Sequence, residues 1–179
     1  MTRVRRAWAH LGVLVFNIVV THVPVRQLRL GVLRLWGARI GRDSSVFRGT
    51  TVLGIELLRI GTSTNIGFRC MLDARGGLTI GDNVVVASDT HFIAGTHEIN
   101  SSTFEPLLLP TVVGDYAWLT SRVTVTAGVT IGRGAVVAAC ALVRDDVEPM
   151  AVMAGVPAKR VGTREAELTY SPGWHPIGF

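Results

Sequence analysis

Residues 113–143 read VGDYAWLTSRVTVTAGVTIGRGAVVAACALV, and an aliphatic residue opens every six-residue unit of this stretch. These positions are Val113, Leu119, Val125, Ile131, Val137 and Val143. A period near six is too short for a helical repeat and is typical of a β-helix, in which the chain winds into a three-sided coil. Each unit supplies one short strand and one corner, so three units close a turn of about 18 residues.

This geometry predicts which residues stack between neighbouring turns, about 4.8 Å apart. The expected pairs are Val113 over Ile131, Leu119 over Val137, and Val125 over Val143.

The first half of the chain keeps a longer period of about 20 residues, as expected if each turn carries two additional residues on its third face. The aligned rows are Ile40, Ile60 and Ile80; Val46, Ile66 and Val86; and Val52, Leu72 and Phe92. Glycines near the additions, in Gly54-Ile55 and Gly76-Gly77, suit a bulge or corner. We therefore expect about five turns, at 40–59, 60–79, 80–112, 113–130 and 131–148, with a C-terminal extension at 149–179.

The N-terminal segment, 1–39, is basic and apolar. It contains seven arginines and no carboxylate, whereas the rest of the chain has eleven basic and thirteen acidic residues. We expect a helical arm over 1–39, with a first helix in the run from Ala7 to Val20 and a second over 25–37. The first run is about 14 residues, short of the roughly 20 that span a bilayer.

Two roles are open for residues 1–23: a helix lying in the interface of an anionic membrane, or a helix packed on the protein body or a sister subunit. Nucleic acid is not an expected partner, because phosphate-binding arms are solvated rather than apolar. The run is not followed by a small-residue cleavage site, so a secretory signal is not expected either. Cys70 and Cys140 lack the count and spacing of a disulfide framework or zinc site, and both are expected to be small buried fillers.

The repeat is interrupted at residues 93–112, where the spacing from Ile80 to Val113 rises to thirty-three and the sequence becomes polar. Insertions in repeat arrays commonly map to a binding face. His97 lies in this excursion and is a candidate general base at neutral pH; the alternative is a surface histidine of a loop. His91 comes one unit earlier and falls on a neighbouring face, which disfavours a metal site built by the two histidines alone; a third ligand from a neighbouring subunit is the alternative that would complete one.

At this point three stretches become recognisable. Gly95-Thr96-His97 follows the unit Ile80-Gly81-Asp82-Asn83, residues 113–132 run from Val-Gly-Asp to Thr-Ile-Gly, and residues 154–159 read Ala-Gly-Val-Pro-Ala-Lys. In these motifs the chain from about Ile40 to Val161 resembles the hexapeptide-repeat acyltransferases, especially sugar O-acetyltransferases of the colanic-acid, maltose and galactoside type. The resemblance implies an all-β, left-handed parallel β-helix that assembles as a homotrimer. It also implies that acetyl-CoA binds in the cleft between neighbouring prisms of the trimer.

The resemblance also assigns roles to residues of this chain. His97 would take the proton from the acceptor hydroxyl, and the Ser121 backbone N–H would stabilise the oxyanion. Trp118 would wall the cleft across the interface, and Ala139 would meet the pantetheine arm. Lys159, the only lysine in the chain, would meet a CoA phosphate.

The chain departs from the family pattern in three places. Arg144-Asp145-Asp146 stands where the family often has Thr-Lys-Asp, and Gly67 stands near the acceptor-binding asparagine of galactoside-type members. Asp73 and Arg75 resemble the colanic-acid branch and are candidates to bind acceptor hydroxyls; the alternative is a corner ion pair.

The sequence thus predicts an acetyl-CoA-dependent O-acetyltransferase of a sugar, glycan or glycosylated metabolite in polysaccharide biosynthesis, with no metal. The expected location is the cytoplasm, including the inner membrane face. The rivals are a xenobiotic or antibiotic acetyltransferase, a zinc hydratase of the carbonic-anhydrase β-helix type, and a catalytically silent trimeric scaffold.

Overall fold

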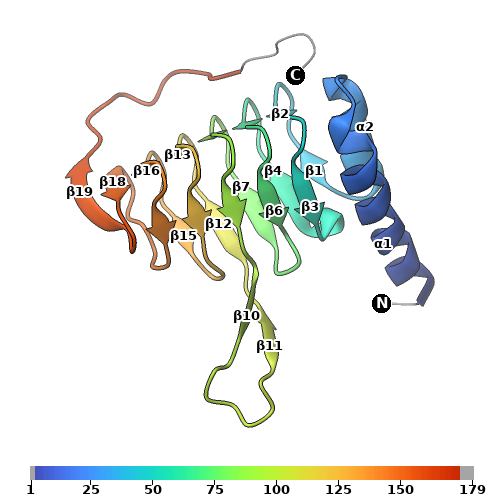
Figure 1. Cartoon of the computed structure of the whole chain (residues 1–179). Helices are drawn as coiled ribbons and strands as arrows, with labels where there is room; N and C mark the ends of the chain where they lie inside the picture. Colours follow the sequence, from blue (N-terminus) through green and yellow to red (C-terminus); the bar gives the residue numbers. More distant parts are fainter. Residues whose placement is uncertain (1–2, 174–179) are drawn as a thin grey trace.

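The computed structural model describes residues 3–173, and it is a three-sided coil of parallel strands with helices at one end (Figure 1). Face A contains β1 (Arg39–Ile40), β4 (Leu58–Ile60), β7 (Leu78–Ile80), β12 (Thr111–Val113) and β15 (Thr130–Ile131). Face B contains β2 (Ser45–Val46), β5 (Asn65–Ile66), β8 (Val85–Val86), β13 (Trp118–Leu119), β16 (Val136–Val137), β18 (Ala151–Ala154) and β19 (Lys159–Thr163). Face C contains β3 (Thr51–Leu53), β6 (Met71–Asp73), β9 (His91–Phe92), β14 (Thr124–Val125) and β17 (Leu142–Val143).

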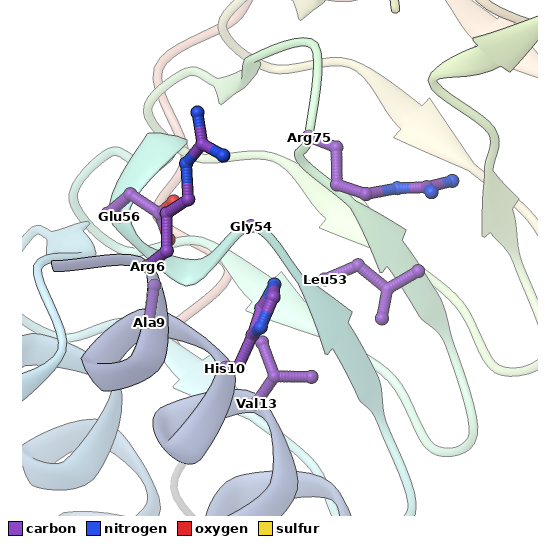
Figure 2. A pocket seen from close by; sticks show the side chains of 8 residues that line it. All are labelled: Arg6, Ala9, His10, Val13, Leu53, Gly54, Glu56 and Arg75. Atoms are coloured by element: carbon purple, nitrogen blue, oxygen red, sulfur yellow. The ribbon is translucent and has the colours of Figure 1, made fainter. Parts of the chain in front are cut away.

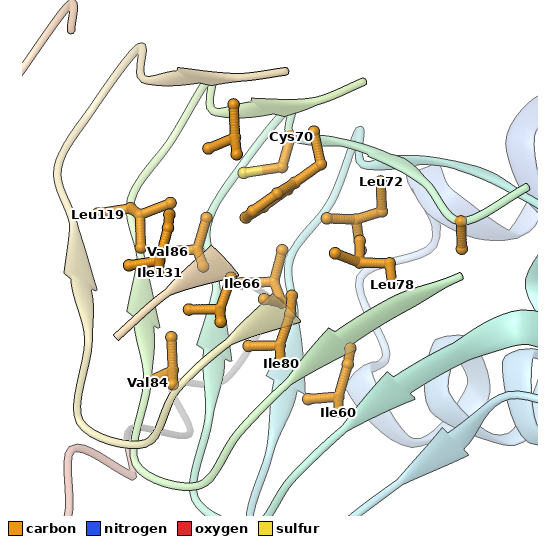
Figure 3. Close-up of a cluster of buried hydrophobic side chains, with 14 of the residues drawn as sticks. Ile60, Ile66, Cys70, Leu72, Leu78, Ile80, Val84, Val86, Leu119 and Ile131 are labelled. Atoms are coloured by element: carbon orange, nitrogen blue, oxygen red, sulfur yellow. The ribbon is translucent and has the colours of Figure 1, made fainter. Parts of the chain in front are cut away.

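The rows of aliphatic residues form the core, as the repeat predicts (Figure 3). The three expected pairs of the second half are in register: Val113 with Ile131, Leu119 with Val137, and Val125 with Val143. The longer period of the first half is also confirmed, because β1, β4 and β7 pair in parallel with Ile40 opposite Ile60 and Ile60 opposite Ile80. Each fully buried Leu or Ile contributes roughly 1.5–3 kcal/mol, so the stacked rows supply the main stabilisation of the coil.

The corners of the coil place residues in the left-handed backbone region. Asp43, Ser63 and Asn83 occupy the equivalent corner of three successive turns, with φ of 56°, 54° and 56°. Asp and Asn tolerate this conformation better than most residues. At Gly41 the constraint is contact instead, because an added Cβ would overlap the backbone of Gly61 one turn away. Both features let flat turns stack closely.

The number of turns differs from the expected five. Five turns are complete, and a partial sixth follows, in which Val147 bridges to Ile131 and β18 pairs in parallel with β16. The prediction that the winding ends at residue 148 is therefore wrong. A turn of about 18 residues would place Pro149 opposite Ile131, but Val147 takes that position in the structure. The turn is therefore shorter here, and the six-residue period does not continue in the sequence.

The C-terminal extension begins with β19, which pairs antiparallel with β18. The chain then runs back along face B toward the first turns (Figure 1), where the Asn65 side chain donates a hydrogen bond to the Pro172 carbonyl (2.5 Å). The extension therefore covers part of face B.

The two cysteines differ in environment. Cys70 is buried as expected, and burial raises the pKa of its thiol to about 11. The expectation of burial is wrong for Cys140, which is exposed at a corner with φ of 61°. The six-residue pattern identifies core positions, but it does not distinguish a short side chain inside a corner from one outside it.

The N-terminal arm closes the first turn of the coil. It contains α1 (Arg3–Ile18), the 3₁₀ helix η1 (Val20–His22) and α2 (Arg26–Leu35), followed by a second 3₁₀ helix, η2 (Ile55–Leu57), in the coil itself. Phe16, Leu30 and Leu33 are buried against the first turn. One face of the arm therefore packs on the protein body, as one of the two alternatives for this segment proposed.

Polar side chains of the arm bond the backbone edge that the first turn would otherwise leave open. Asn17 makes two hydrogen bonds to Val52 of β3: its Nδ2 donates to the carbonyl (3.0 Å), and its Oδ1 accepts from the N–H (2.9 Å). The same edge accepts from Thr21 at Thr50 O (2.7 Å), from Arg29 at Val46 O (2.8 Å) and from Arg26 at Ser44 O (3.2 Å). An unpaired buried backbone group costs about as much as a lost hydrogen bond, so the arm is a structural cap.

We predict that Asn17→Ala lowers the free energy of unfolding by about 2 kcal/mol, because two hydrogen bonds to a partly buried edge are lost. Denaturant titration measures the change. The matched control is Asn100→Ala in the exposed excursion, for which little change is expected. Equal midpoints for the two variants would contradict the capping role of Asn17.

Candidate functional site

The excursion expected at 93–112 contains a β-hairpin that leaves the coil at the corner between faces C and A, and the coil resumes at Thr111 in β12. Its strands are β10 (Gly95–His97) and β11 (Pro106–Leu108), paired antiparallel with His97 opposite Pro106. The hairpin projects away from the coil (Figure 1). It carries several exposed apolar side chains: Ile99, Phe104, Leu107, Leu108 and Leu109.

The base of the hairpin is fixed by contacts with the preceding turn. The Asp73 carboxylate accepts a hydrogen bond from Ala94 N–H (3.3 Å), and the Ala94 carbonyl accepts from Leu109 N–H (3.0 Å). Gly76 lies directly against Leu109, and an added Cβ would overlap the Leu109 backbone. These contacts position His97, which follows Ala94 closely in the chain.

Asp73 and Arg75 form a bidentate ion pair. The Arg75 Nε and Nη2 atoms donate to the two carboxylate oxygens at 2.8 and 2.7 Å, and the Arg75 N–H adds a third bond. Burial acts to raise the pKa of Asp73, but the hydrogen bonds from Arg75 and Ala94 outweigh it and lower the pKa below its usual value. The corner ion pair proposed as the alternative is therefore present. Asp73 has little exposed surface, whereas half of the Arg75 side chain is exposed.

His97 is exposed, and its ring is fixed by Phe104. The two rings stack with centroids 4.2 Å apart and an interplanar angle of 8°. Nδ1 of His97 lies 2.9 Å from the Phe104 carbonyl oxygen. A carbonyl can only accept, so in the neutral imidazole Nδ1 carries the proton and Nε2 keeps its lone pair. This tautomer suits a general base that acts through Nε2.

A cavity of about 440 Å³ lies between α1 and the coil beside the Asp73–Arg75 pair. Figure 2 shows Arg6 and His10 of α1, Glu56 of the coil and Arg75 around it. Arg75 also links the cavity to the hairpin, because its Nη2 lies close to Gly95. Sequence reasoning missed Arg6, His10 and Glu56. The spacing of Arg6, His10 and Val13 on one helical face was the available signal.

The other predicted site residues lie on a different part of the coil. Trp118 is half-exposed on face B, and Ser121 lies at the corner between faces B and C. Ala139 occupies the equivalent corner one turn on, as the hydrogen bond from Cys140 N–H to the Ser121 carbonyl indicates (3.1 Å). Lys159 is exposed in β19, at the end of face B. These four residues follow face B and its corner with face C.

The candidate residues therefore form two groups on different edges of one prism. His97, Asp73 and Arg75 lie at the edge between faces C and A; Ser121 and Ala139 lie at the edge between B and C. A six-residue unit of extended chain spans on the order of 15–20 Å, so face C separates the groups. A single chain does not bring the two groups together.

The described part of the chain contains no cluster of metal-ligating side chains. Among residues 3–173, no three His, Cys, Asp or Glu side chains are placed to hold a metal ion. His91 lies on face C of the coil and His97 on the hairpin, so the two histidines do not form a metal site within the described part of one chain.

Comparisons with known proteins agree on one family. The chain is 32% identical over 130 residues to WcaF of Escherichia coli K12, an acetyltransferase assigned to colanic acid biosynthesis, covering 73% of this chain and 71% of that protein. It is 34% identical over 85 residues to galactoside O-acetyltransferase of the same organism, covering 46% and 42%. No protein-family profile matches the chain.

A solved structure matches the fold over most of the chain. It is a hexapeptide-repeat-containing acetyltransferase of Vibrio cholerae in complex with acetyl coenzyme A, with a TM-score of 0.79 and 28% identity. The match covers 91% of this chain and 88% of that one. The likeness confirms the expected parallel, left-handed β-helix.

We predict that Asp73→Asn removes part of the acid sensitivity of the fold. The lowered pKa of Asp73 stabilises the wild type above the ordinary carboxyl pKa, and this stabilisation is lost as pH falls through the folded-state pKa. The variant should therefore be less stable than the wild type at pH 7, and the difference should shrink from about pH 4 downward.

Thermal unfolding of both proteins between neutral and acidic pH measures the effect. Asp145→Asn is the matched control, because Asp145 is exposed and makes only a long surface ion pair (3.6 Å). A constant difference between wild type and Asp73→Asn at all pH values would contradict the role of the ionised carboxylate.

Proposed function

Because the chain belongs to the hexapeptide-repeat acetyltransferases, we propose that it transfers an acetyl group from acetyl-CoA to a hydroxyl of a sugar or glycan. The observation that carries the proposal is His97 on the hairpin. Its ring is held by Phe104 in the tautomer that leaves Nε2 free to accept a proton. An alcohol is a weak nucleophile until a base removes its proton, so the reaction needs such a group.

In this proposal the acceptor oxygen attacks the thioester carbonyl while Nε2 of His97 takes its proton. The resulting oxyanion accepts a hydrogen bond from the Ser121 N–H, and collapse of the intermediate releases the CoA thiolate, which takes the proton from His97. Trp118 walls the cleft, Ala139 contacts the pantetheine arm, and Lys159 meets a CoA phosphate. No metal takes part.

The acceptor is proposed to bind in the cavity beside Arg75. Half of the Arg75 side chain is exposed there, and the ion pair with Asp73 fixes its guanidinium. Arginine offers several fixed donors to hydroxyl oxygens. Asp73 acts mainly as a positioning residue, because its two oxygens are occupied by Arg75 and the base of the hairpin.

We also propose that the working enzyme is a homotrimer. The two groups of site residues lie on different edges of one prism. If three prisms stand side by side around a threefold axis that runs along their length, edge C–A of one protomer meets edge B–C of the next. The exposed apolar residues of the hairpin support this arrangement, since a neighbouring coil would cover them. Trp118 is a further exposed residue that the same contact would cover.

The location that we propose is the cytoplasm, with part of the enzyme at the inner face of the membrane. The partner surface there would be an anionic bilayer contacted through residues 1–23. The charge of the arm supports this proposal, since residues 1–39 hold seven arginines and no carboxylate.

We predict that His97→Ala lowers kcat by about 10²- to 10⁴-fold, the usual contribution of a positioned general base. The measurement of kcat follows the release of the CoA thiol when the enzyme is given acetyl-CoA and one acceptor from a panel of sugars, glycans and aromatic alcohols. His22→Ala is the matched control, since His22 is exposed in η1, away from both groups of site residues. Turnover by His97→Ala equal to that of His22→Ala would refute the mechanism, and transfer only to the aromatic alcohols would replace the glycan acceptor.

We predict that two inactive variants complement each other in mixed trimers. His97→Ala removes the base, and Ala139→Trp blocks the opposite edge, so a site built from two protomers is intact in some interfaces of a mixture. Random assembly of equal amounts leaves roughly a quarter of the sites intact. Activity after joint refolding should approach this fraction, and no recovery in properly assembled trimers would show that each site lies within one protomer.

A further inference from the structure

The outward face of the N-terminal cap is apolar, which is unusual for the end of a solenoid. Terminal caps of repeat proteins normally present a polar outer face, because no further repeat covers that face and it contacts water. Here nine large apolar side chains of the arm are between 46% and 78% exposed. They are Val4, Trp8, Leu11, Leu14, Ile18, Val19, Val25, Leu28 and Leu35.

These residues follow helical geometry. On α1, Val4, Trp8, Leu11 and Ile18 recur at three-, four- and seven-residue intervals and so share one face. The opposite face holds Phe16, which is fully buried against the coil. The helix therefore has two apolar faces, of which the coil uses one. We call the other, with the exposed residues of α2, the outer face of the cap.

The charge at the start of α1 has a single sign. Arg3, Arg5 and Arg6 lie at the start of α1, and no acidic residue lies in its first turn. Cations at a helix N-terminus oppose the helix dipole and destabilise the helix. Their placement therefore does not serve the stability of the helix, but it suits an anionic surface.

A second cluster of arginines adjoins α2. Arg26, Arg34 and Arg42 line a cavity of about 310 Å³, together with Gln27, Leu30, Asp43 and Ser44. Three guanidinium groups outnumber the one carboxylate there, and arginine binds phosphate through paired N–H donors. Arg34 uses Nη2 to reach the carbonyls of Ile40 and Gly41, which fixes its position beside the cavity.

We propose that the outer face of the cap docks onto an anionic lipid bilayer, with the exposed apolar residues in the headgroup boundary and the arginines on lipid phosphates. Interfacial helices combine an apolar face with flanking basic residues in this way. The proposal concerns the cap alone and does not require the transferase activity. In the proposed trimer all three caps face the same side, which would increase the avidity.

The segment Arg3–His22 is a 20-residue helical stretch apolar enough to cross a membrane by length and composition, longer than the run that the sequence indicated. Docking at the interface is favoured over crossing, because Phe16, Asn17 and Thr21 attach the inner face of this segment to the coil. A crossing helix would have to break those contacts, whereas a helix lying on the surface keeps them.

The test is sedimentation of the full-length protein with vesicles of phosphatidylcholine alone or with about a third phosphatidylglycerol. The wild type should bind the anionic vesicles, and binding should weaken as salt rises toward roughly 0.5 M. Leu11→Ser combined with Ile18→Ser should weaken binding at least tenfold, and Arg3→Gln combined with Arg42→Gln about fivefold per arginine. Val156→Ser with Val161→Ser is the matched control at the far end of the coil, where both residues are exposed.

Two results would overturn the proposal. One is absence of binding to anionic vesicles by a folded wild type. The other is self-association through the cap, seen as a species of twice the expected mass that the Leu11→Ser, Ile18→Ser variant dissociates. Acetyl transfer to a soluble acceptor is measured in the same variants. Loss of vesicle binding with unchanged transfer concerns the cap alone, whereas absence of transfer in the wild type concerns the proposed enzymatic function.

Discussion

The coil depends on the pairing of every backbone edge with the turn above or below it. Stacked parallel turns satisfy this requirement internally, and the buried aliphatic rows follow from it, but the requirement cannot be met at the two ends. At the first turn Asn17, Thr21 and Arg29 supply the missing partners from the arm. At the other end β18 and β19 fold into an antiparallel pair that closes face B. The helical arm is therefore part of the fold rather than an appendage to it.

The same requirement explains the position of the hairpin. A chain that leaves a stacked turn must restore the pairing on its return, and β7 pairs directly with β12 across the excursion. At the corner where the hairpin leaves the coil, the Asp73 carboxylate accepts hydrogen bonds from the Ala94 N–H and from the Arg75 side chain. One buried carboxylate thus links the coil, the base of the hairpin and the cavity next to α1. The position of His97 depends on that link, although Asp73 itself has little surface from which to contact an acceptor.

The sequence predicted the features that depend on local periodicity and missed those that depend on distant partners. The rows through Ile40 and Val113 gave the core and its register, because each repeat imposes the same environment on equivalent residues. The partial sixth turn was missed because the shortened spacing before Val147 removes the period. Asn17 bonds the distant Val52, and Arg29 is a fully buried cation that donates to a carbonyl of the coil. No pattern within the arm identifies such partners, since they are set by the edge on which the arm packs.

The division of candidate residues between two edges has a structural cause. Strands of a flat three-sided coil point their outward side chains away from one another, so a single convex prism cannot surround a substrate. A concave site needs either an insertion that rises from the surface or a second surface opposite. This chain has the first in the hairpin with His97, and its remaining candidates, Trp118, Ser121 and Ala139, lie where only a neighbouring prism could bring them opposite that hairpin. The trimer that we propose would therefore be a condition of the chemistry, because a coil of stacked turns cannot fold around a substrate by itself.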